Sequence, residues 1–207
     1  MKKKIIPPYR NRLHLLYLLN ERKIKHACEV GVFRGGYSRE ILGRIHSLET
    51  LYLVDLWENQ ANYHDLCNGS KEEMNKHFLK TLDNTSKWKN KTKVLKGYST
   101  SVCEKIPDNS LDWVYIDARH DYLGCKEDIF AYWPKLKSNG IMSGHDYIEN
   151  HELQKMQPNS DWSICYDGSF HPGAVKGAVD EFANNNNLQV IVGYKEPDYP
   201  SWSILKP

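Results

Sequence analysis

Short apolar runs alternate with longer amphipathic segments along most of this 207-residue chain. A short apolar run bounded by turn residues indicates a buried strand, whereas apolar residues three or four apart indicate a helix. The runs predict strands at residues 26–30, 51–54, 93–96, 111–116, 141–144, 188–192 and 202–205. The periodic segments predict helices at residues 9–25, from 38 onward, within 59–90, at 122–136 and at 174–184.

This order of elements predicts an α/β fold with a doubly wound, mostly parallel sheet of seven strands. No helix separates the last two strands, so we expect them to pair antiparallel. The length suits one hydrophobic core, which predicts a single domain over residues 1–207 with a helical extension at 1–25.

Two of the helices have apolar faces that we expect to point inward. The first face consists of Leu13, Leu16 and Leu19. The second, within 59–90, consists of Met74, Phe78, Leu79 and Leu82.

Composition excludes several function classes. Lys and Arg number 28 against 26 Asp and Glu, so no strong field favours nucleic acid or a membrane surface as partner. No apolar stretch is long enough to span a bilayer, and the N-terminal residues do not resemble a secretory signal. The five cysteines show no CxxC spacing, which disfavours a zinc knuckle or disulfide scaffold and suggests a cytoplasmic protein.

A glycine-rich turn follows the first predicted strand, in the run Glu29-Val30-Gly31-Val32-Phe33-Arg34-Gly35-Gly36. Glycine lets a backbone approach a ligand closely and adopt positive φ. Glu29 replaces the first glycine of the dinucleotide fingerprint, and an acid there repels a pyrophosphate but suits a cationic amino acid. Ordinary tight turns also carry such glycines. We expect Glu29, Gly31, Gly35, Gly36 and Ser38 to bind a cofactor.

The ends of the next two strands add further cofactor candidates. Asp55 lies 26 residues after Glu29 and is placed to bind ribose hydroxyls, although capping a helix is the alternative. Leu56 and Trp57 follow it, and Trp57 either covers the adenosine or belongs to the core. Gly97, Tyr98 and Ser99 are expected to line the adenine, with a helix cap as the alternative for Ser99.

These motifs together resemble those of class I S-adenosylmethionine-dependent methyltransferases, which have a Rossmann-like fold. The resemblance runs from about residue 26 to 192, and its most specific segments are Tyr115-Ile116-Asp117-Ala118-Arg119-His120-Asp121-Tyr122 and Gly140-Ile141-Met142-Ser143-Gly144-His145-Asp146. The chain looks particularly like a small family with an "IDxxHxY" segment and a terminal "HD" strand. The resemblance implies S-adenosyl-L-methionine as cofactor.

Four polar residues end the fourth and fifth strands: Asp117, His120, His145 and Asp146. Oxygen and nitrogen ligands converging there can hold a divalent cation such as Mg²⁺, Mn²⁺ or Ca²⁺. His120 suits a general base, since its unperturbed pKa lies near neutral pH. Resemblance to metal-dependent sugar and diol O-methyltransferases implies that Asp117 and Asp146 are ligands and that His120 is the base. His145 stands where the sugar enzymes have Glu, and we take it as the third ligand.

The predicted activity is O-methylation of a small-molecule or glycan acceptor, such as a sugar or other polyol. The loop at 147–172 is expected to cover the acceptor, and Tyr63, Tyr147, Trp162 and Tyr166 are candidates for stacking on it. Asp121 and Tyr122 are expected to cap and pack a helix, and Asp128 to face solvent. A metal-independent methyltransferase, a nicotinamide-dependent oxidoreductase and a non-catalytic binding module are the alternatives. The sequence leaves the oligomeric state open, with a homodimer as one option.

Overall fold

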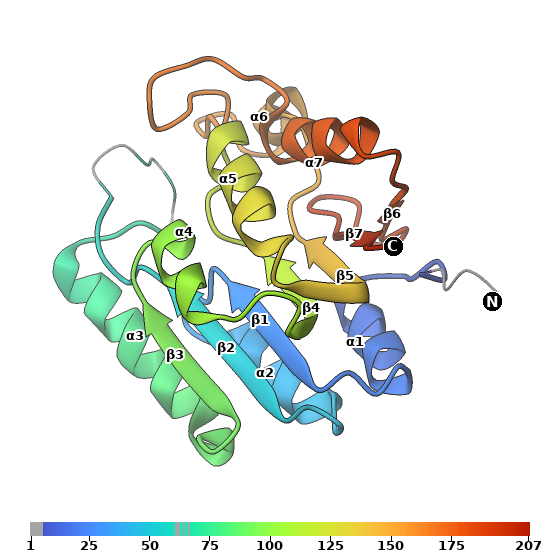
Figure 1. The fold of residues 1–207 in the computed structure, drawn as a ribbon. Coiled ribbons are helices and arrows are strands. Elements are labelled where there is room, and N and C mark those ends of the chain that lie inside the picture. The colour runs from blue at the N-terminus through green and yellow to red at the C-terminus, as the bar shows by residue number, and fades with distance from the viewer. Residues whose placement is uncertain (1–5, 61–62, 64, 66) are drawn as a thin grey trace.

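The chain forms a seven-stranded sheet between two layers of helices (Figure 1) in a computed structural model that describes residues 6–60, 63, 65 and 67–207. The strands are β1 (His26–Val30), β2 (Thr50–Asp55), β3 (Thr92–Lys96), β4 (Leu111–Ile116), β5 (Leu136–Gly144), β6 (Val190–Val192) and β7 (Trp202–Leu205). The helices are α1 (Arg12–Glu21), α2 (Gly36–Arg44), α3 (Lys71–Thr85), α4 (Ser99–Val102), α5 (Tyr122–Tyr132), α6 (Asn150–Met156) and α7 (Ala174–Asn185), with short 3₁₀ turns η1 (Ser86–Trp88) and η2 (Cys103–Lys105). Residues 1–5 of the predicted extension lie outside the described residues.

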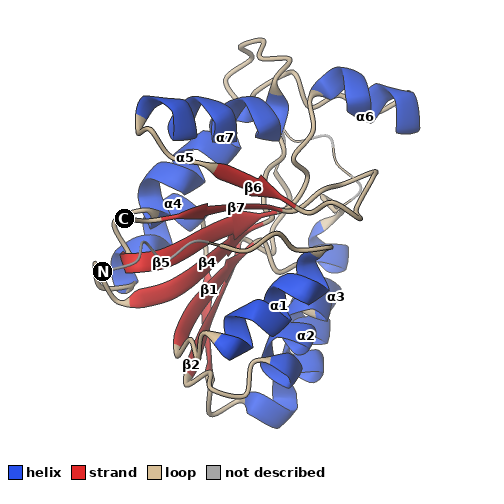
Figure 2. Cartoon of the chain, turned by 90° about the vertical axis from the view of Figure 1, so that its right-hand side faces the viewer, coloured by secondary structure: helices blue, strands red, loops and turns tan. Residues whose placement is uncertain are grey.

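The sheet has the order β3-β2-β1-β4-β5-β7-β6. β1 to β5 pair in parallel, and β7 pairs antiparallel with both β5 and β6. The predicted doubly wound sheet with an antiparallel last pair is therefore confirmed. Helices α1, α2 and α3 cover one face, and α4, α5 and α7 cover the other (Figure 2).

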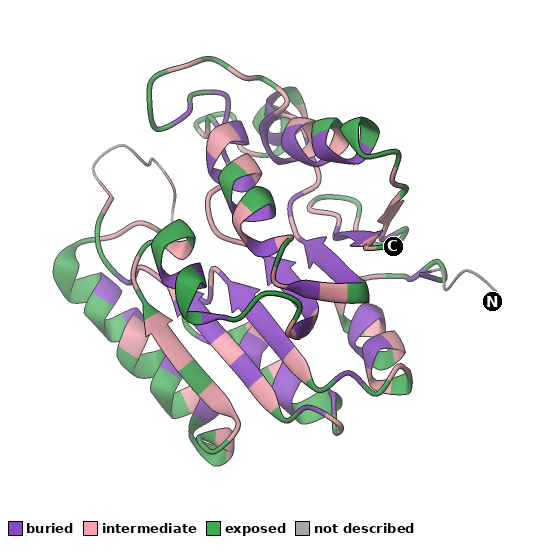
Figure 3. Cartoon of the chain, in the orientation of Figure 1, coloured by how far each residue is buried: buried purple, intermediate pink, exposed green. Residues whose placement is uncertain are grey.

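The central strands are apolar on both faces, as expected for parallel strands covered by helices on both sides. In β4, Val114 and Ile116 belong to the core beneath α5 and α7. Trp113 and Tyr115 alternate with them and belong to the core beneath α1 and α2. The sheet interior is accordingly buried along most of its length (Figure 3).

The predicted inward face of α1 is wrong at one position. Leu15, Leu16 and Leu19 are buried, whereas Leu13 is 39% exposed. The helix is shorter than the predicted 9–25, and its buried side is the one that carries Leu15, Leu16 and Leu19, with Leu13 outside it.

The predicted inward face of α3 is wrong at two positions, because Leu79 and Leu82 are exposed. The buried residues include His77 and Thr81 beside Met74. Thr81 Oγ1 donates to the carbonyl of Phe33 at 3.0 Å. The packing face is therefore determined partly by hydrogen bonds to the glycine-rich turn rather than by apolar side chains alone.

Element boundaries differ in the second half of the chain. β5 begins at Leu136, five residues before its predicted start at 141, and α5 ends at Tyr132. The β4–β5 pairing changes register between Leu111 and Trp113, which accommodates the extra residues of β5. The predicted loop at 147–172 contains α6 and an isolated bridge between Ile164 and Phe170.

A buried polar chain links the N-terminal segment to the sheet. Trp113 Nε1 donates to Ser143 Oγ at 3.1 Å, and the hydroxyl groups of Ser143 and Ser203 lie 2.9 Å apart. The Tyr9 hydroxyl lies 3.0 Å from that of Ser203 and donates to the Ser201 carbonyl. The residues before α1 are thus attached to the antiparallel edge of the same sheet.

Over the described part of the chain, every helix is too short or too polar to cross a membrane.

We predict that Ser143→Ala lowers the free energy of unfolding by about 1–3 kcal/mol, because it leaves the buried indole N–H of Trp113 without an acceptor. Chemical denaturation measures this change. The control is Ser86→Ala at an exposed position, which should alter stability by less than about 0.5 kcal/mol. Equal stability of the two variants would contradict the structural role of the polar chain.

Candidate active site

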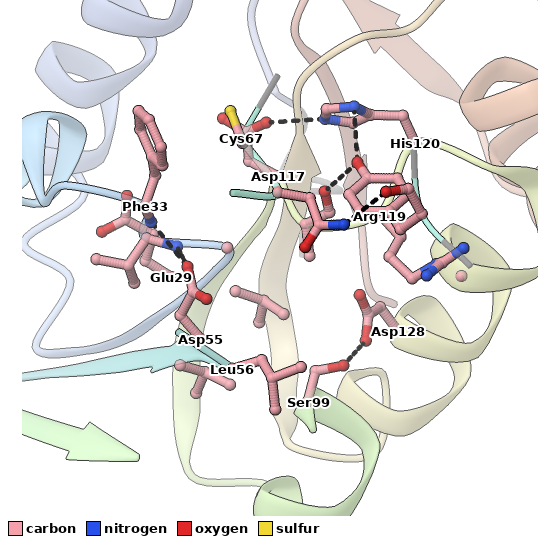
Figure 4. A pocket seen from close by; sticks show the side chains of 18 of the residues that line it. Glu29, Phe33, Asp55, Leu56, Cys67, Ser99, Asp117, Arg119, His120 and Asp128 are labelled. Atoms are coloured by element: carbon pink, nitrogen blue, oxygen red, sulfur yellow. Dashed lines mark hydrogen bonds and ion pairs between the residues drawn. The ribbon is translucent and has the colours of Figure 1, made fainter. Parts of the chain in front are cut away.

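A cavity of about 1040 Å³ opens at the carboxyl ends of the parallel strands (Figure 4). This is where ligands bind in open α/β sheets, and the volume suits a cofactor together with a small acceptor. Its lining includes these residues predicted from the sequence: Glu29, Gly31, Gly36, Asp55, Leu56, Gly97, Tyr98, Ser99, Asp117, His120, His145 and Asp146.

The first turn of the cavity wall depends on Gly31. Its φ is +89°, and a Cβ atom placed there would lie 1.9 Å from the carbonyl oxygen of Asp117. The Gly31 N–H donates to Val54 at 2.9 Å, and the Asp117 N–H donates to Val30 at 2.7 Å. Only glycine fits between the ends of β1 and β4. The turn therefore lies directly against Asp117, the first residue after β4.

The Asp55 carboxylate holds two strained loops together. Its Oδ2 accepts from the N–H groups of Val32 and Phe33 at 2.8 and 2.7 Å, and its Oδ1 accepts from that of Trp57 at 3.0 Å. Phe33 and Trp57 both have positive φ, at 55° and 44°, which is unfavourable for aromatic residues. Asp55 lines the cavity near the predicted ribose position, but its carboxylate already stabilises this backbone, and its ribose role stays a prediction.

Three predicted cofactor residues are not among those that line the cavity: Gly35, Ser38 and Trp57. Trp57 is 1% exposed, packs on Phe78 and donates its indole N–H to Phe33, so the core alternative describes it. Gly35 precedes α2 with a φ of 70°, and a Cβ atom placed there would lie 3.0 Å from the Cα of Thr81.

Glu29 is buried in the cavity wall with Ser38 behind it. The Ser38 hydroxyl donates to the Glu29 carboxylate. Burial, reinforced by the nearby Asp117 and only partly offset by Ser38, raises the pKa of Glu29 to about 8. In the free protein Glu29 is therefore largely protonated near neutral pH, and a cationic ligand would favour its charged form.

At the ends of β4 and β5, the imidazole of His120 lies among three carboxylates. His120 Nε2 is 3.1 Å from Asp146 Oδ2 and 3.8 Å from Asp117 Oδ1, and its Nδ1 is 3.1 Å from Asp65 Oδ2. The Tyr63 hydroxyl also lies 3.1 Å from Nδ1. Burial disfavours a charged imidazole, but these neighbours outweigh it and raise the pKa of His120 well above its ordinary value.

Among the described residues, Asp117, His120 and Asp146 form a group that could hold a cation, with possible ligand atoms within 4.8 Å of one another. The predicted set contained His145 in place of His120, and His145 is not part of this group. His145 Nδ1 is 3.1 Å from Asp146 Oδ1, the other oxygen of that carboxylate, so His145 lies behind the Asp146 side chain. Asp146 itself has a φ of 58°, which a β-branched side chain would disfavour.

Asp128 was expected to face solvent, and this is wrong. It is 3% exposed on α5, lines the cavity and accepts a hydrogen bond from the Ser99 hydroxyl. Burial is the main cause that raises its pKa to about 7. The predicted cap at Asp121 is present, with its carboxylate accepting from Gly124 at 3.0 Å. Asp128, about two helical turns further on, lies on the face of α5 that contacts Ser99.

Sequence reasoning also missed Arg12. This residue begins α1, lines the cavity and lies 3.8 Å from Asp117, with its guanidinium carbon 5.1 Å from the centre of the Tyr37 ring. The other candidates were identified as polar residues at the ends of predicted strands, and Arg12 does not follow a strand. Asp65 was missed for the same reason, because it lies in a long loop.

The four aromatic residues predicted to contact the acceptor differ in position. Tyr63 and Tyr166 line the cavity. Trp162 is 6% exposed and packs on His120 with ring centres 4.4 Å apart, whereas Tyr147 donates its hydroxyl to Asp180 and is not part of the lining. The 147–172 segment thus contributes Tyr166 to the wall and Trp162 beneath it.

A family model described as a methyltransferase domain matches residues 28–147, more than half of the chain. The chain belongs to this methyltransferase family. The matched region includes the glycine-rich turn, Asp55, Ser99 and the cluster around His120, and it excludes Arg12. No curated protein sequence matches the chain.

Solved structures of methyltransferases superpose on nearly the whole chain. A Staphylococcus aureus protein provisionally described as a caffeoyl-CoA O-methyltransferase is 16% identical, with a TM-score of 0.66 over 98% of this chain and 85% of that one. An O-methyltransferase from Bacillus cereus, in complex with S-adenosylhomocysteine, is 13% identical, with a TM-score of 0.63 over 100% and 84%. The N-methyltransferase NodS from Bradyrhizobium japonicum is 9% identical, with a TM-score of 0.59 over 95% and 94%. At these identities the likeness shows the fold, and it confirms the predicted class I methyltransferase architecture.

We predict that Gly31→Ala and Gly36→Ala have opposite outcomes. Gly31→Ala forces the β1 and β4 ends apart and should lower the melting temperature by several degrees or prevent folding. At Gly36 a Cβ meets nothing within 4 Å, so Gly36→Ala should leave the melting temperature unchanged or raised. Thermal unfolding of both variants tests this, and a tolerated Gly31→Ala would disprove the close contact.

Proposed function

We propose that this methyltransferase transfers a methyl group from S-adenosylmethionine to a hydroxyl oxygen of a sugar, glycan or similar polyol, assisted by a divalent cation. One observation carries the proposal. A single cavity contains the glycine-rich turn with its buried acid and, against it, the carboxylate–imidazole cluster of Asp117, His120 and Asp146. This arrangement supports a cofactor site with a cation site beside it.

The charges of the cavity suit the methionine end of S-adenosylmethionine. Glu29 offers an acid to the ammonium group, and Arg12 offers a cation to the carboxylate. Asp55 and Ser99 follow along the wall toward the ribose and base positions. When bound, the cofactor would supply an electrophilic methyl group, and the fold would hold it facing the acceptor.

Asp117, His120 and Asp146 would hold the cation. Carboxylates with one imidazole suit Mg²⁺ or Mn²⁺, and Ca²⁺ less well. Such an ion supplies Lewis acidity, which lowers the pKa of an acceptor hydroxyl and orients it. Nε2 of His120 would be the ligand atom, and Asp65 would fix the ring through Nδ1, as outer carboxylates do for metal-bound histidines.

Nε2 of His120 also has a second proposed role, as the general base. A ring that donates its Nδ1 proton to Asp65 has a single lone pair, at Nε2. That lone pair can accept the acceptor's proton or bind a cation, but not both at once. We favour the ligand role, because Nε2 points between two carboxylates that also need a positive partner. The metal-independent alternative corresponds to the base role.

The acceptor half of the cavity supports a hydroxyl-rich substrate. Tyr63, Tyr166, Gln60 and Asn68 all line the cavity. Aromatic rings and amide groups in one wall suit a sugar ring. We place the reaction in the cytoplasm, in keeping with the five free cysteines.

We predict that S-adenosylhomocysteine binds the wild-type protein and that NADH does not, as measured by isothermal titration calorimetry. Arg12→Ala should weaken S-adenosylhomocysteine by about tenfold or more, since it removes a charge-assisted hydrogen bond. The control Arg10→Ala changes an exposed arginine two residues earlier and should leave the affinity unaltered. Binding of NADH alone would refute the cofactor assignment.

We further predict that Mn²⁺ binds the wild-type protein, followed by electron paramagnetic resonance. His120→Gln should abolish binding, whereas His145→Gln should weaken it only modestly, because His145 contacts the ligand Asp146 from behind. Binding retained in His120→Gln but lost in His145→Gln would restore the ligand set expected from the sequence.

Methyl transfer to a panel of sugars and polyols tests the reaction itself. Release of S-adenosylhomocysteine should stop in EDTA and return with Mg²⁺ or Mn²⁺. If activity persists in EDTA and is lost in His120→Gln, the imidazole acts as base rather than ligand.

A further inference from the structure

We propose that Asp128, together with Ser99, selects the base of the cofactor by accepting a hydrogen bond from the exocyclic amino group of adenine. The inference rests on the proposed use of S-adenosylmethionine. It makes Asp128, on α5, a residue that determines specificity for the base, whereas most of the site comes from strand ends.

The two residues form one unit in the cavity wall. Ser99 begins α4 directly after β3, and Asp128 comes from the middle of α5. The Ser99 hydroxyl donates to Oδ1 of Asp128, and both side chains line the cavity (Figure 4). The Tyr132 hydroxyl donates to the Ser99 carbonyl at 3.0 Å, so α5 holds this turn at two points.

Position along the cavity indicates which part of the cofactor this unit meets. Glu29 suits the ammonium of the methionine end, and Asp55 lies between Glu29 and Ser99, with Leu56 beside it (Figure 4). A ligand that spans from charged to apolar surroundings would therefore place its planar base near Leu56, Ser99 and Asp128.

The hydrogen-bonding polarity of the unit decides which base it accepts. Ser99 has one hydroxyl proton, and Asp128 takes it. Oδ2 of Asp128 has no donor among the described residues, although the carboxyl is 3% exposed. The unit therefore offers acceptors to the cavity. An exocyclic amino group is a donor and fits, whereas the carbonyl that replaces it in hypoxanthine is an acceptor and is repelled.

The protonation of the Asp128 carboxyl is compatible with its accepting a hydrogen bond from an amino group. Burial raises the pKa of Asp128 to about 7, so near neutral pH the protonated and ionised forms are both present. An amino group that donates to the carboxylate favours the ionised form, whereas a carbonyl beside it does not.

The test compares S-adenosylhomocysteine with S-inosylhomocysteine, in which a carbonyl replaces the amino group and the neighbouring N1 carries a proton, by calorimetry on full-length protein. Wild type should prefer the adenosyl ligand by at least about tenfold, because the inosyl carbonyl would face an unpaired buried carboxylate. Asp128→Asn offers an amide that can donate or accept, so the preference should fall to near one or reverse. Glu127→Gln is the control, since it neutralises the adjacent carboxylate on the cavity rim and should keep the wild-type preference.

The ratio of the two affinities is the decisive readout, because any loss of folded protein lowers both affinities equally. If Asp128→Asn does not fold, Asp128→Ser replaces the carboxylate with a small hydroxyl and should also bring the ratio near one. An unchanged ratio in these variants, or equal loss of both ligands, would overturn the proposal and leave Asp128 structural. Wild-type protein that binds neither ligand would instead remove the proposed cofactor itself.

Discussion

The contact between Gly31 and the backbone of Asp117 is the constraint on which the site depends. It brings the end of β1 against the end of β4 so closely that a Cβ atom has no room. This contact brings the glycine-rich turn, with its cofactor residues, into the same cavity as the Asp117 carboxylate. A wider separation would accommodate other residues but would divide the cavity into two sites.

The turn also carries strain, and Asp55 compensates for it. Two aromatic residues with positive φ cost free energy on their own, and three backbone N–H groups directed at one carboxylate offset this. Thr81 and Trp57 then bind the Phe33 carbonyl from behind. The loop is therefore rigid before any ligand arrives, which reduces the entropy lost when one binds.

Opposite charges lie next to one another around His120. Asp65, Asp117 and Asp146 surround His120, and Arg12 approaches Asp117 from α1. A partly buried group of three carboxylates requires positive partners, and a protonated imidazole or a divalent cation can supply them. The N-terminal helix thus contributes to the electrostatics of the site although it lies outside the matched methyltransferase region.

The sequence by itself determined the order of strands and helices along the chain, the parallel sheet with an antiparallel last pair, and the strand ends where Glu29, Asp55 and Asp117 lie. Apolar periodicity and turn residues are local signals, and they suffice for this. Only the tertiary structure brought His120 between Asp117 and Asp146, buried Asp128, placed Trp57 in the core and brought Arg12 into the cavity wall. Each of these depends on which side chain of a distant element lies opposite, as Ser99 does for Asp128. Such pairings are set by packing between layers, and no spacing along the chain encodes them.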